Sequence, residues 1–99
     1  MRRAARIDAT QNEIAEVLKA FGCQILYLHQ VGGGCPDLLV RKRSRSRIHG
    51  GFVTWNELVL VECKTRTGKL RQAQQDLIDA GWPIVVLRSA DEALAWLKG

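Results

Sequence analysis

Long apolar segments are missing from this 99-residue sequence, although 46% of its residues are hydrophobic. Its apolar runs are short, as in Leu58–Val61 and Ile84–Leu87, whereas a helix that spans a bilayer needs roughly 18–20 consecutive apolar residues. The first residues include arginines but no apolar segment of the kind that a secretory signal carries. We therefore expect a protein without membrane spans, located in the cytosol of a bacterium or of a phage-infected host.

Metal-binding patterns of cysteine and histidine are also absent. The three cysteines, Cys23, Cys35 and Cys63, are widely spaced and form no CxxC pair, which argues against a disulfide framework and a zinc ribbon. His29 and His49 have no second ligand at metal spacing, so neither zinc nor a histidine-based nuclease is indicated.

Acidic residues are fewer than basic ones, with 10 Asp and Glu against 15 Lys and Arg and a net charge of +5. Five cations fall within seven residues: Arg41, Lys42, Arg43, Arg45 and Arg47. Such a run favours a polyanionic partner and is a candidate DNA-binding stretch. The alternative is a solvated hairpin tip, which a charge run alone leaves equally open.

Length and periodicity predict one α/β domain over residues 1–99. Apolar spacing and turn residues place its elements in the order α-β-β-β-α-β-α. The expected ranges are helix 10–22, strands 23–29, 37–40 or slightly longer and 55–64, helix 69–80, strand 82–88 and helix 91–98. This order predicts a mixed β-sheet flanked by helices.

Two acidic residues are expected to meet on this sheet. Alternation along the strand places Glu62 and Lys64 on one face, where a simple ion pair would explain them. Asp37 follows a glycine run and Pro36, at the start of a strand that we expect to lie beside Glu62. Because adjacent carboxylates repel each other unless a cation lies between them, we expect a hard divalent ion such as Mg²⁺.

The ordered residues Pro36-Asp37 and Glu62-Cys63-Lys64 resemble the PD-(D/E)xK nuclease superfamily. Glu13 in the first helix, the glycine-rich approach to Asp37 and the start of the helix at 68–74 make the chain similar to the virus-type replication-repair nuclease (VRR-NUC) domain, of the minimal stand-alone phage or bacterial type.

The resemblance implies a restriction-endonuclease-like fold and a DNA endonuclease that depends on Mg²⁺ or Mn²⁺. It implies Asp37, Glu62, the Cys63 backbone carbonyl and Glu13 as metal ligands, with Lys64 orienting or deprotonating the attacking water. It also implies a homodimer that cleaves branched DNA, as Holliday-junction resolvases do. The preferred DNA structure and the number of ions stay open.

Glu13 and Gln74 each also fit a purely structural role. Glu13 would be the N3 residue of a capping box if Thr10 is the N-cap. Gln74 falls within an apolar helical stripe, where it would be either a paired buried amide or a contact to the metal site or its water; we assign it to the catalytic site. Two further functions are open for the chain: a non-catalytic basic nucleic-acid-binding module, or a structural subunit of a phage replication or repair complex.

Overall fold

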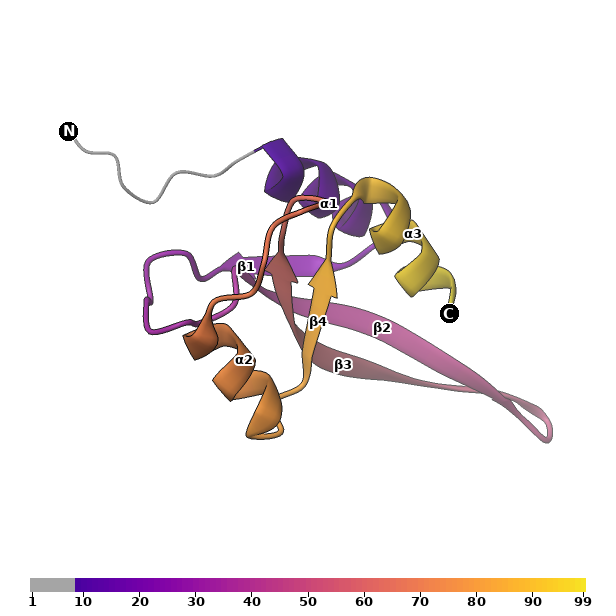
Figure 1. Cartoon of the computed structure of the whole chain (residues 1–99). Coiled ribbons are helices and arrows are strands. Elements are labelled where there is room, and N and C mark those ends of the chain that lie inside the picture. Colours follow the sequence, from indigo (N-terminus) through magenta and orange to yellow (C-terminus); the bar gives the residue numbers. More distant parts are fainter. Residues whose placement is uncertain (1–8) are drawn as a thin grey trace.

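The computed structural model describes residues 9–99, and the predicted order of elements is confirmed (Figure 1). Within these residues the elements are α1 (Ala9–Ala20), β1 (Gln24–Tyr27), β2 (Leu38–Ile48), β3 (Gly51–Cys63), α2 (Gln72–Asp79), β4 (Ile84–Leu87) and α3 (Ala90–Lys98). They form a single α/β domain. None of the helices in this part of the chain is both long and apolar enough to span a membrane.

The four strands form one mixed sheet in the order β1-β2-β3-β4. The first two pairs are antiparallel, whereas β3 and β4 are parallel, which requires a crossover connection such as the one through α2. In the β2–β3 pair Leu38 lies opposite Val61. Asp37 and Glu62, the next residues outward on each chain, are therefore brought to the same end of the sheet.

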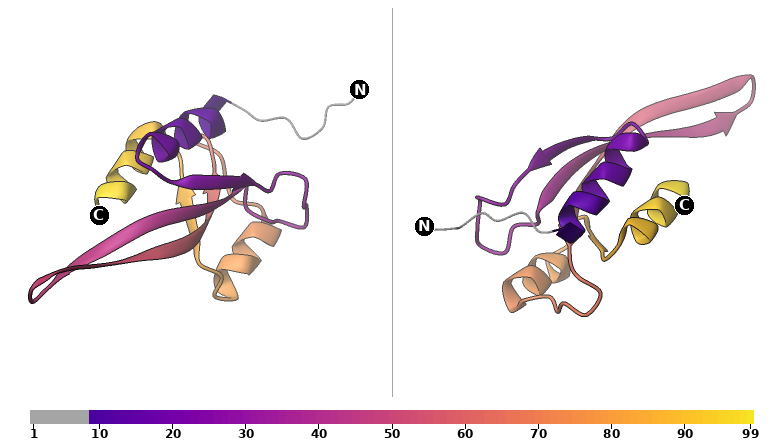
Figure 2. Two further views of the ribbon diagram at one scale, coloured as in Figure 1. Left: turned by 180° about the vertical axis from the view of Figure 1, so that it is seen from behind. Right: turned by 90° about the horizontal axis from the view of Figure 1, so that it is seen from above.

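The helices divide between the two faces of the sheet (Figures 1 and 2). Helices α1 and α3 pack on the face that carries Leu38, Val40 and Val61, and this layer holds the buried core. Helix α2 lies against the other face, on which Leu60 and Glu62 alternate with the core residues. Glu62 thus belongs to the face that α2 covers at one end.

A long hairpin formed by β2 and β3 extends well beyond the other two strands (Figure 2). The second strand was expected to end near Val40 and the third to begin at Trp55. Both boundaries are wrong, because β2 continues to Ile48 and β3 begins at Gly51. The stretch at 43–47 has no apolar alternation, yet it pairs with residues 52–56, which are rich in strand-forming Phe, Val, Thr and Trp. We call residues 43–56 the arm.

The first helix differs from the prediction in its start and its buried stripe. Ala9 and Thr10 are already helical, so the predicted N-cap at Thr10 is wrong. Gln11, Ile14, Ala15 and Leu18 form the buried stripe, whereas Phe21, seven residues after Ile14 and so on this stripe by simple helical periodicity, is 58% exposed.

Gly22 and Ser89 lie at helix ends, and α2 begins later than predicted. Gly22 follows α1 with a φ of +87°, as expected for a residue that terminates a helix. Ser89 caps α3 and accepts a hydrogen bond from the Glu92 backbone N–H over 3.0 Å. Helix α2 begins at Gln72, three residues later than the expected start at Lys69.

Candidate active site

A polar cavity of about 280 Å³ lies at the end of β3. It is enclosed by the start of α1, the loop between β1 and β2, the end of β3 and the first turn of α2. Its polar side chains include Gln11, His29, Asp37, Glu62, Lys64 and Gln74. Four of these, Asp37, Glu62, Lys64 and Gln74, are predicted site residues, and the fold brings them together.

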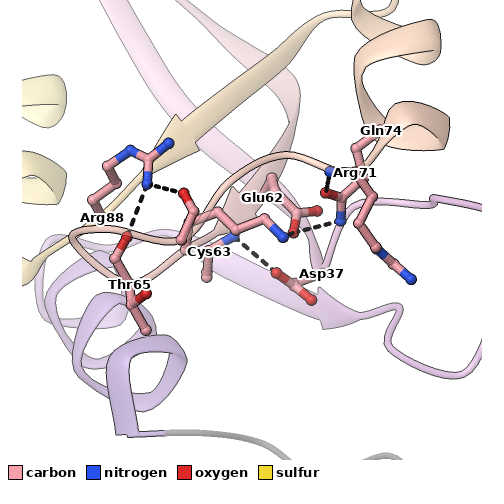
Figure 3. A network of polar contacts seen from close by, with 9 residues as sticks. Asp37, Glu62, Cys63, Thr65, Arg71, Gln74 and Arg88 are labelled. Carbon is pink, nitrogen blue, oxygen red and sulfur yellow. Dashed lines mark hydrogen bonds and ion pairs between the residues drawn. The ribbon is translucent and has the colours of Figure 1, made fainter.

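Asp37 is anchored to the main chain of the neighbouring strand. Its Oδ2 accepts a hydrogen bond from the Cys63 backbone N–H over 2.8 Å (Figure 3), and its own carbonyl accepts one from the Leu28 N–H over 2.7 Å. In an extended strand the N–H and C=O of one residue point toward the same neighbour. The Cys63 carbonyl is therefore directed to the side on which Asp37 lies, as the predicted ligand set requires.

Glu62 is only 4% exposed and its two carboxylate oxygens differ. Oε2 accepts a hydrogen bond from Gln74 Nε2 over 3.0 Å and lies 3.7 Å from Lys64 Nζ. Oε1 is buried and has no hydrogen-bond partner within residues 9–99. One oxygen of Glu62 is thus held in place, and the other has no hydrogen-bond donor among the described residues.

Burial and a second carboxylate keep Glu62 from ionising easily. Burial is the largest cause and the negative charge of Asp37 the next, and together they raise the Glu62 pKa from 4.5 to about 7, although Lys64 lowers it in part. A bound cation would stabilise the charged form of such a carboxylate and so remove the cause of its raised pKa.

Gln74 connects this carboxylate to the start of α2. Its Oε1 accepts a hydrogen bond from the Arg71 backbone N–H over 2.8 Å, so its amide nitrogen faces Glu62. Both ends of the amide are engaged, which fixes the side chain between the helix terminus and the carboxylate. Gln74 is therefore a paired buried amide, the alternative left open by the sequence, and because its partner is the predicted ligand Glu62 it also contacts the candidate site.

Glu13 does not reach this cavity. It is exposed, and it lies about 200° around α1 from Gln11, since successive residues of a helix are about 100° apart. Gln11, which is 5% exposed, lines the cavity instead. The sequence offered a cue to Gln11: it precedes Ile14 by three positions, which places a polar side chain on the apolar stripe.

Sequence reasoning missed three other features of the cavity. His29 appeared isolated in the sequence, but it lies in the cavity wall beside Asp37 and Glu62. Arg71 also contributes to the wall, and its charge lowers the Glu62 pKa. Gly34 packs so closely on α2 that a Cβ added to it would lie 2.8 Å from the Ala73 Cβ.

The donor set is smaller than the predicted one but fits a hard cation. The described residues contain no group of three or more His, Cys, Asp or Glu side chains that could hold a metal, so two carboxylates and one carbonyl remain. Mg²⁺ is commonly held by one or two carboxylates together with water and phosphate oxygens. Glu62, whose Oε1 has no hydrogen-bond partner among the described residues, lines the same polar cavity, and the residues present therefore suit such an ion.

The basic residues of 41–47 lie outside this cavity. They lie on the hairpin, and alternation along β2 separates them into two sets. One face carries Arg41, Arg43, Arg45 and Arg47, while Lys42 projects from the other, with its Nζ 4.8 Å from the centre of the Trp96 ring. The predicted DNA-binding residues therefore do not form one surface.

Comparisons with protein-family models, with curated protein sequences and with solved structures give no match to this chain. The function must therefore be argued from the fold and from the residues in the cavity.

Proposed function

We propose that the chain is a metal-dependent DNA endonuclease of the PD-(D/E)xK type, similar to VRR-NUC domains. The observation that carries the proposal is the meeting of Asp37 and Glu62 in one polar cavity, although 24 residues separate them in the sequence. Lys64 lies beside them, with its Nζ 3.7 Å from Glu62 Oε2. An isolated Glu-x-Lys ion pair would need neither the second carboxylate nor a cavity.

Asp37, Glu62 and the Cys63 carbonyl would hold Mg²⁺ or Mn²⁺. Such an ion, when bound, lowers the pKa of water and stabilises the negative charge that develops on a phosphate under attack. The chain would then hydrolyse a phosphodiester bond by direct attack of water, without a covalent intermediate.

The side chains of the cavity have separate roles in this proposal. Lys64, which lies at Glu62, orients the attacking water and offsets the charge of the phosphate as an ammonium, whereas only its neutral amine form can accept the proton of that water. Gln74 fixes the Glu62 carboxylate through the hydrogen bond to Oε2. The Cys63 N–H fixes the Asp37 carboxylate through Oδ2. Gln74 and the Cys63 N–H are positioning groups, since their hydrogen bonds are to the carboxylates of the chain and not to the substrate.

We further propose that the nuclease acts on branched DNA as a homodimer. Several large apolar side chains of this small chain are exposed, among them Leu26, Val31 and Trp82, and a second copy would cover part of this area. Two copies would present two cavities to the opposite strands of a junction. Light scattering should give twice the mass of one chain; a monomer at cellular concentrations would contradict the dimer.

The activity is tested by comparing wild type, Asp37→Asn and Lys64→Ala on labelled four-way junctions, flaps, nicked DNA and plain duplex. We expect cleavage by wild type with Mg²⁺ or Mn²⁺ and none with EDTA, whereas the two variants should still bind DNA but not cleave it. Asp79→Asn, which removes an exposed carboxylate of α2, is the control and should cleave normally. If Asp37→Asn changes no activity, the chain is a binding module. If wild type shows no salt-dependent DNA binding, the chain is a structural subunit.

Metal binding has a readout that does not depend on cleavage. A ligand that binds only the folded state at about 100 times its Kd stabilises a protein by about 2.7 kcal/mol, so Mg²⁺ or Mn²⁺ should raise the Tm of wild type and of Asp79→Asn. Asp37→Asn should lose this rise. An equal rise in Asp37→Asn would mean that the ion binds elsewhere.

A further inference from the structure

The long hairpin segregates its charges by face. Its register runs without interruption from Leu38 opposite Val61 to Ile48 opposite Gly51, so directly paired residues share a face. The first face, which we call the arginine face, combines the odd-numbered residues of β2 with the even-numbered residues of β3. Its members are Arg41, Arg43, Arg45 and Arg47 with Leu58, Asn56, Thr54 and Phe52 opposite them.

Between positions 41 and 58 the arginine face carries no carboxylate; the carboxylate farther along this face is Glu62, in the cavity. Glu57, the acidic residue between positions 41 and 58, pairs with Lys42 on the opposite face and hydrogen-bonds to Ser44 there. Within residues 9–99 the one ion pair is that of Lys64 with Glu62. The positive charges of Arg43, Arg45 and Arg47 are thus not neutralised by the described part of the chain.

The arginines of the arm are exposed and supported by an aromatic ring. The guanidinium carbons of Arg45 and Arg47 lie 4.7 and 5.1 Å from the centre of the Phe52 ring. This contact holds the two cations side by side, and both residues are exposed. Arg41, at the base, instead donates to the Gly22 carbonyl over 3.2 Å.

The arginine face is continuous with the cavity. Phe52, Thr54, Asn56, Leu58, Leu60 and Glu62 are alternate residues of β3 and lie on one face of the ribbon. Between the cavity and the arm this face carries Leu60, which is half-buried near Leu77 and Trp82, and Leu58, which is 63% exposed. A long ligand could therefore contact the cavity and the arm together.

We propose that the arginine face docks the β2–β3 ribbon in the major groove of a B-form DNA duplex, away from the phosphate that is cut. The major groove, about 12 Å wide, admits a two-stranded β-ribbon, and arginine binds both phosphates and guanine edges. The exposed row of unneutralised guanidinium groups gives the matching charge. This inference rests on the proposed nuclease function only for the position of the cut.

The length of β3 sets the distance from the arm to the cut. From Glu62 to Asn56, opposite Arg43, and to Phe52, opposite Arg47, a strand spans about 20 and about 34 Å. At about 3.4 Å per base pair, these lengths correspond to about 6 to 10 base pairs. The arm therefore reads duplex on one side of the cut at this distance.

Binding is tested without cleavage, by fluorescence anisotropy of a labelled duplex in EDTA across a range of salt. Arg43→Ala/Arg45→Ala/Arg47→Ala should lower affinity at least about tenfold and reduce the slope of log K against log salt by about 2.7, since each phosphate contact contributes about 0.9. Lys42→Ala removes a charge from the opposite face and should change the affinity and the salt slope only slightly. Equal effects of the two variants would overturn the proposal.

A charge-neutral exchange separates the face from the net charge. Arg45→Ser/Ser46→Arg keeps the composition but moves one cation to the opposite face, and it should lower affinity and salt slope as Arg45→Ala does. Wild-type behaviour of this exchange would mean that only total charge matters. Circular dichroism and Tm of each variant, which should match wild type, establish that the fold is retained.

Two further measurements test the groove and the spacing. An RNA duplex of the same sequence has a deep, narrow major groove that side chains cannot enter. On RNA the triple variant should therefore bind almost as well as wild type. If the triple substitution lowers affinity for RNA as much as it does for DNA, groove docking is overturned. If wild type cleaves DNA, it should cleave faster than the triple variant only where about 6 or more base pairs remain on the arm side of the cut. An advantage that persists on shorter duplexes would overturn the spacing. Arm-dependent binding without cleavage would instead reject the nuclease and leave the docking surface intact.

Discussion

Gln74 Nε2 donates a hydrogen bond to Glu62 Oε2 over 3.0 Å, while its Oε1 accepts one from the Arg71 N–H over 2.8 Å. The amide therefore has one orientation only. It connects a carboxylate at the end of β3 to the first turn of α2, so the place of this helix and the direction of the carboxylate depend on each other.

From this contact we expect Gln74→Ala to impair cleavage but not DNA binding. Loss of the donor frees the Glu62 carboxylate to rotate, and the loss of groups that orient a metal ligand typically costs about 10–100-fold in activity or metal affinity. The Mg²⁺ concentration for half-maximal cleavage should rise. Gln75→Ala is the matched control, because the adjacent Gln75 amide bonds only to Asp79 on the surface. Equal losses in both variants would assign the effect to the helix and not to Glu62.

The stability of the metal-free protein should fall as pH rises. The pKa of Glu62 is about 7 in the folded protein, above its ordinary value of 4.5, so the folded protein keeps a proton that the unfolded chain releases between these values. This contribution to the free energy of unfolding is complete below pH 4.5 and is lost by about pH 7. It amounts to no more than about 3.5 kcal/mol, at about 1.4 kcal/mol per pKa unit.

Urea denaturation in EDTA from pH 4 to pH 8 measures this effect, and Glu62→Gln isolates it from other titrating groups. The variant should be more stable than wild type near pH 8 and should show a flatter dependence on pH. A parallel pH dependence in both proteins would mean that Glu62 ionises normally.

The glycine-rich loop gives a third prediction, which concerns stability. Gly34 has a φ of +81°, and a Cβ there would lie 2.8 Å from the Ala73 Cβ and 2.9 Å from its carbonyl carbon. Gly34→Ala should therefore cost roughly 2–5 kcal/mol, through the left-handed backbone and the clash together. Gly33→Ala is the control, since Gly33 has a φ of +66° and open space around it. It should cost only about 1–2 kcal/mol, and equal costs for the two variants would mean that the contact with α2 yields easily.

The order of elements and the centre of the site were predictable because they depend on short-range patterns. Alternation placed Glu62 and Lys64 on one face, and the turn residues placed Asp37 at the start of a neighbouring strand. Gln11 was not predicted, because periodicity favours a helix that begins at Thr10 and turns the wrong side chain, that of Glu13, toward the sheet. The rotation of a helix is set by packing, which a short periodic stretch does not determine.

The arm could not be predicted, because residues 43–47 have the composition of a loop. They become a strand only through pairing with residues 52–56, a partnership between two segments that neither reveals alone. The same limit applies to Gly34. A glycine run predicts freedom of the backbone, whereas the close approach to Ala73 depends on where α2 is placed by the rest of the fold.

The bond between Asp37 and residue 63 is made by the peptide N–H and not by the Cys63 side chain. The thiol, on the core side of the strand, takes no part in it. Any non-proline residue that fills the same space should therefore hold Asp37 equally well. Substitution at position 63 is therefore limited only by the space in the core. Residue 63 can vary within that limit, whereas the chemistry of Glu62 and Lys64 on either side of it is fixed.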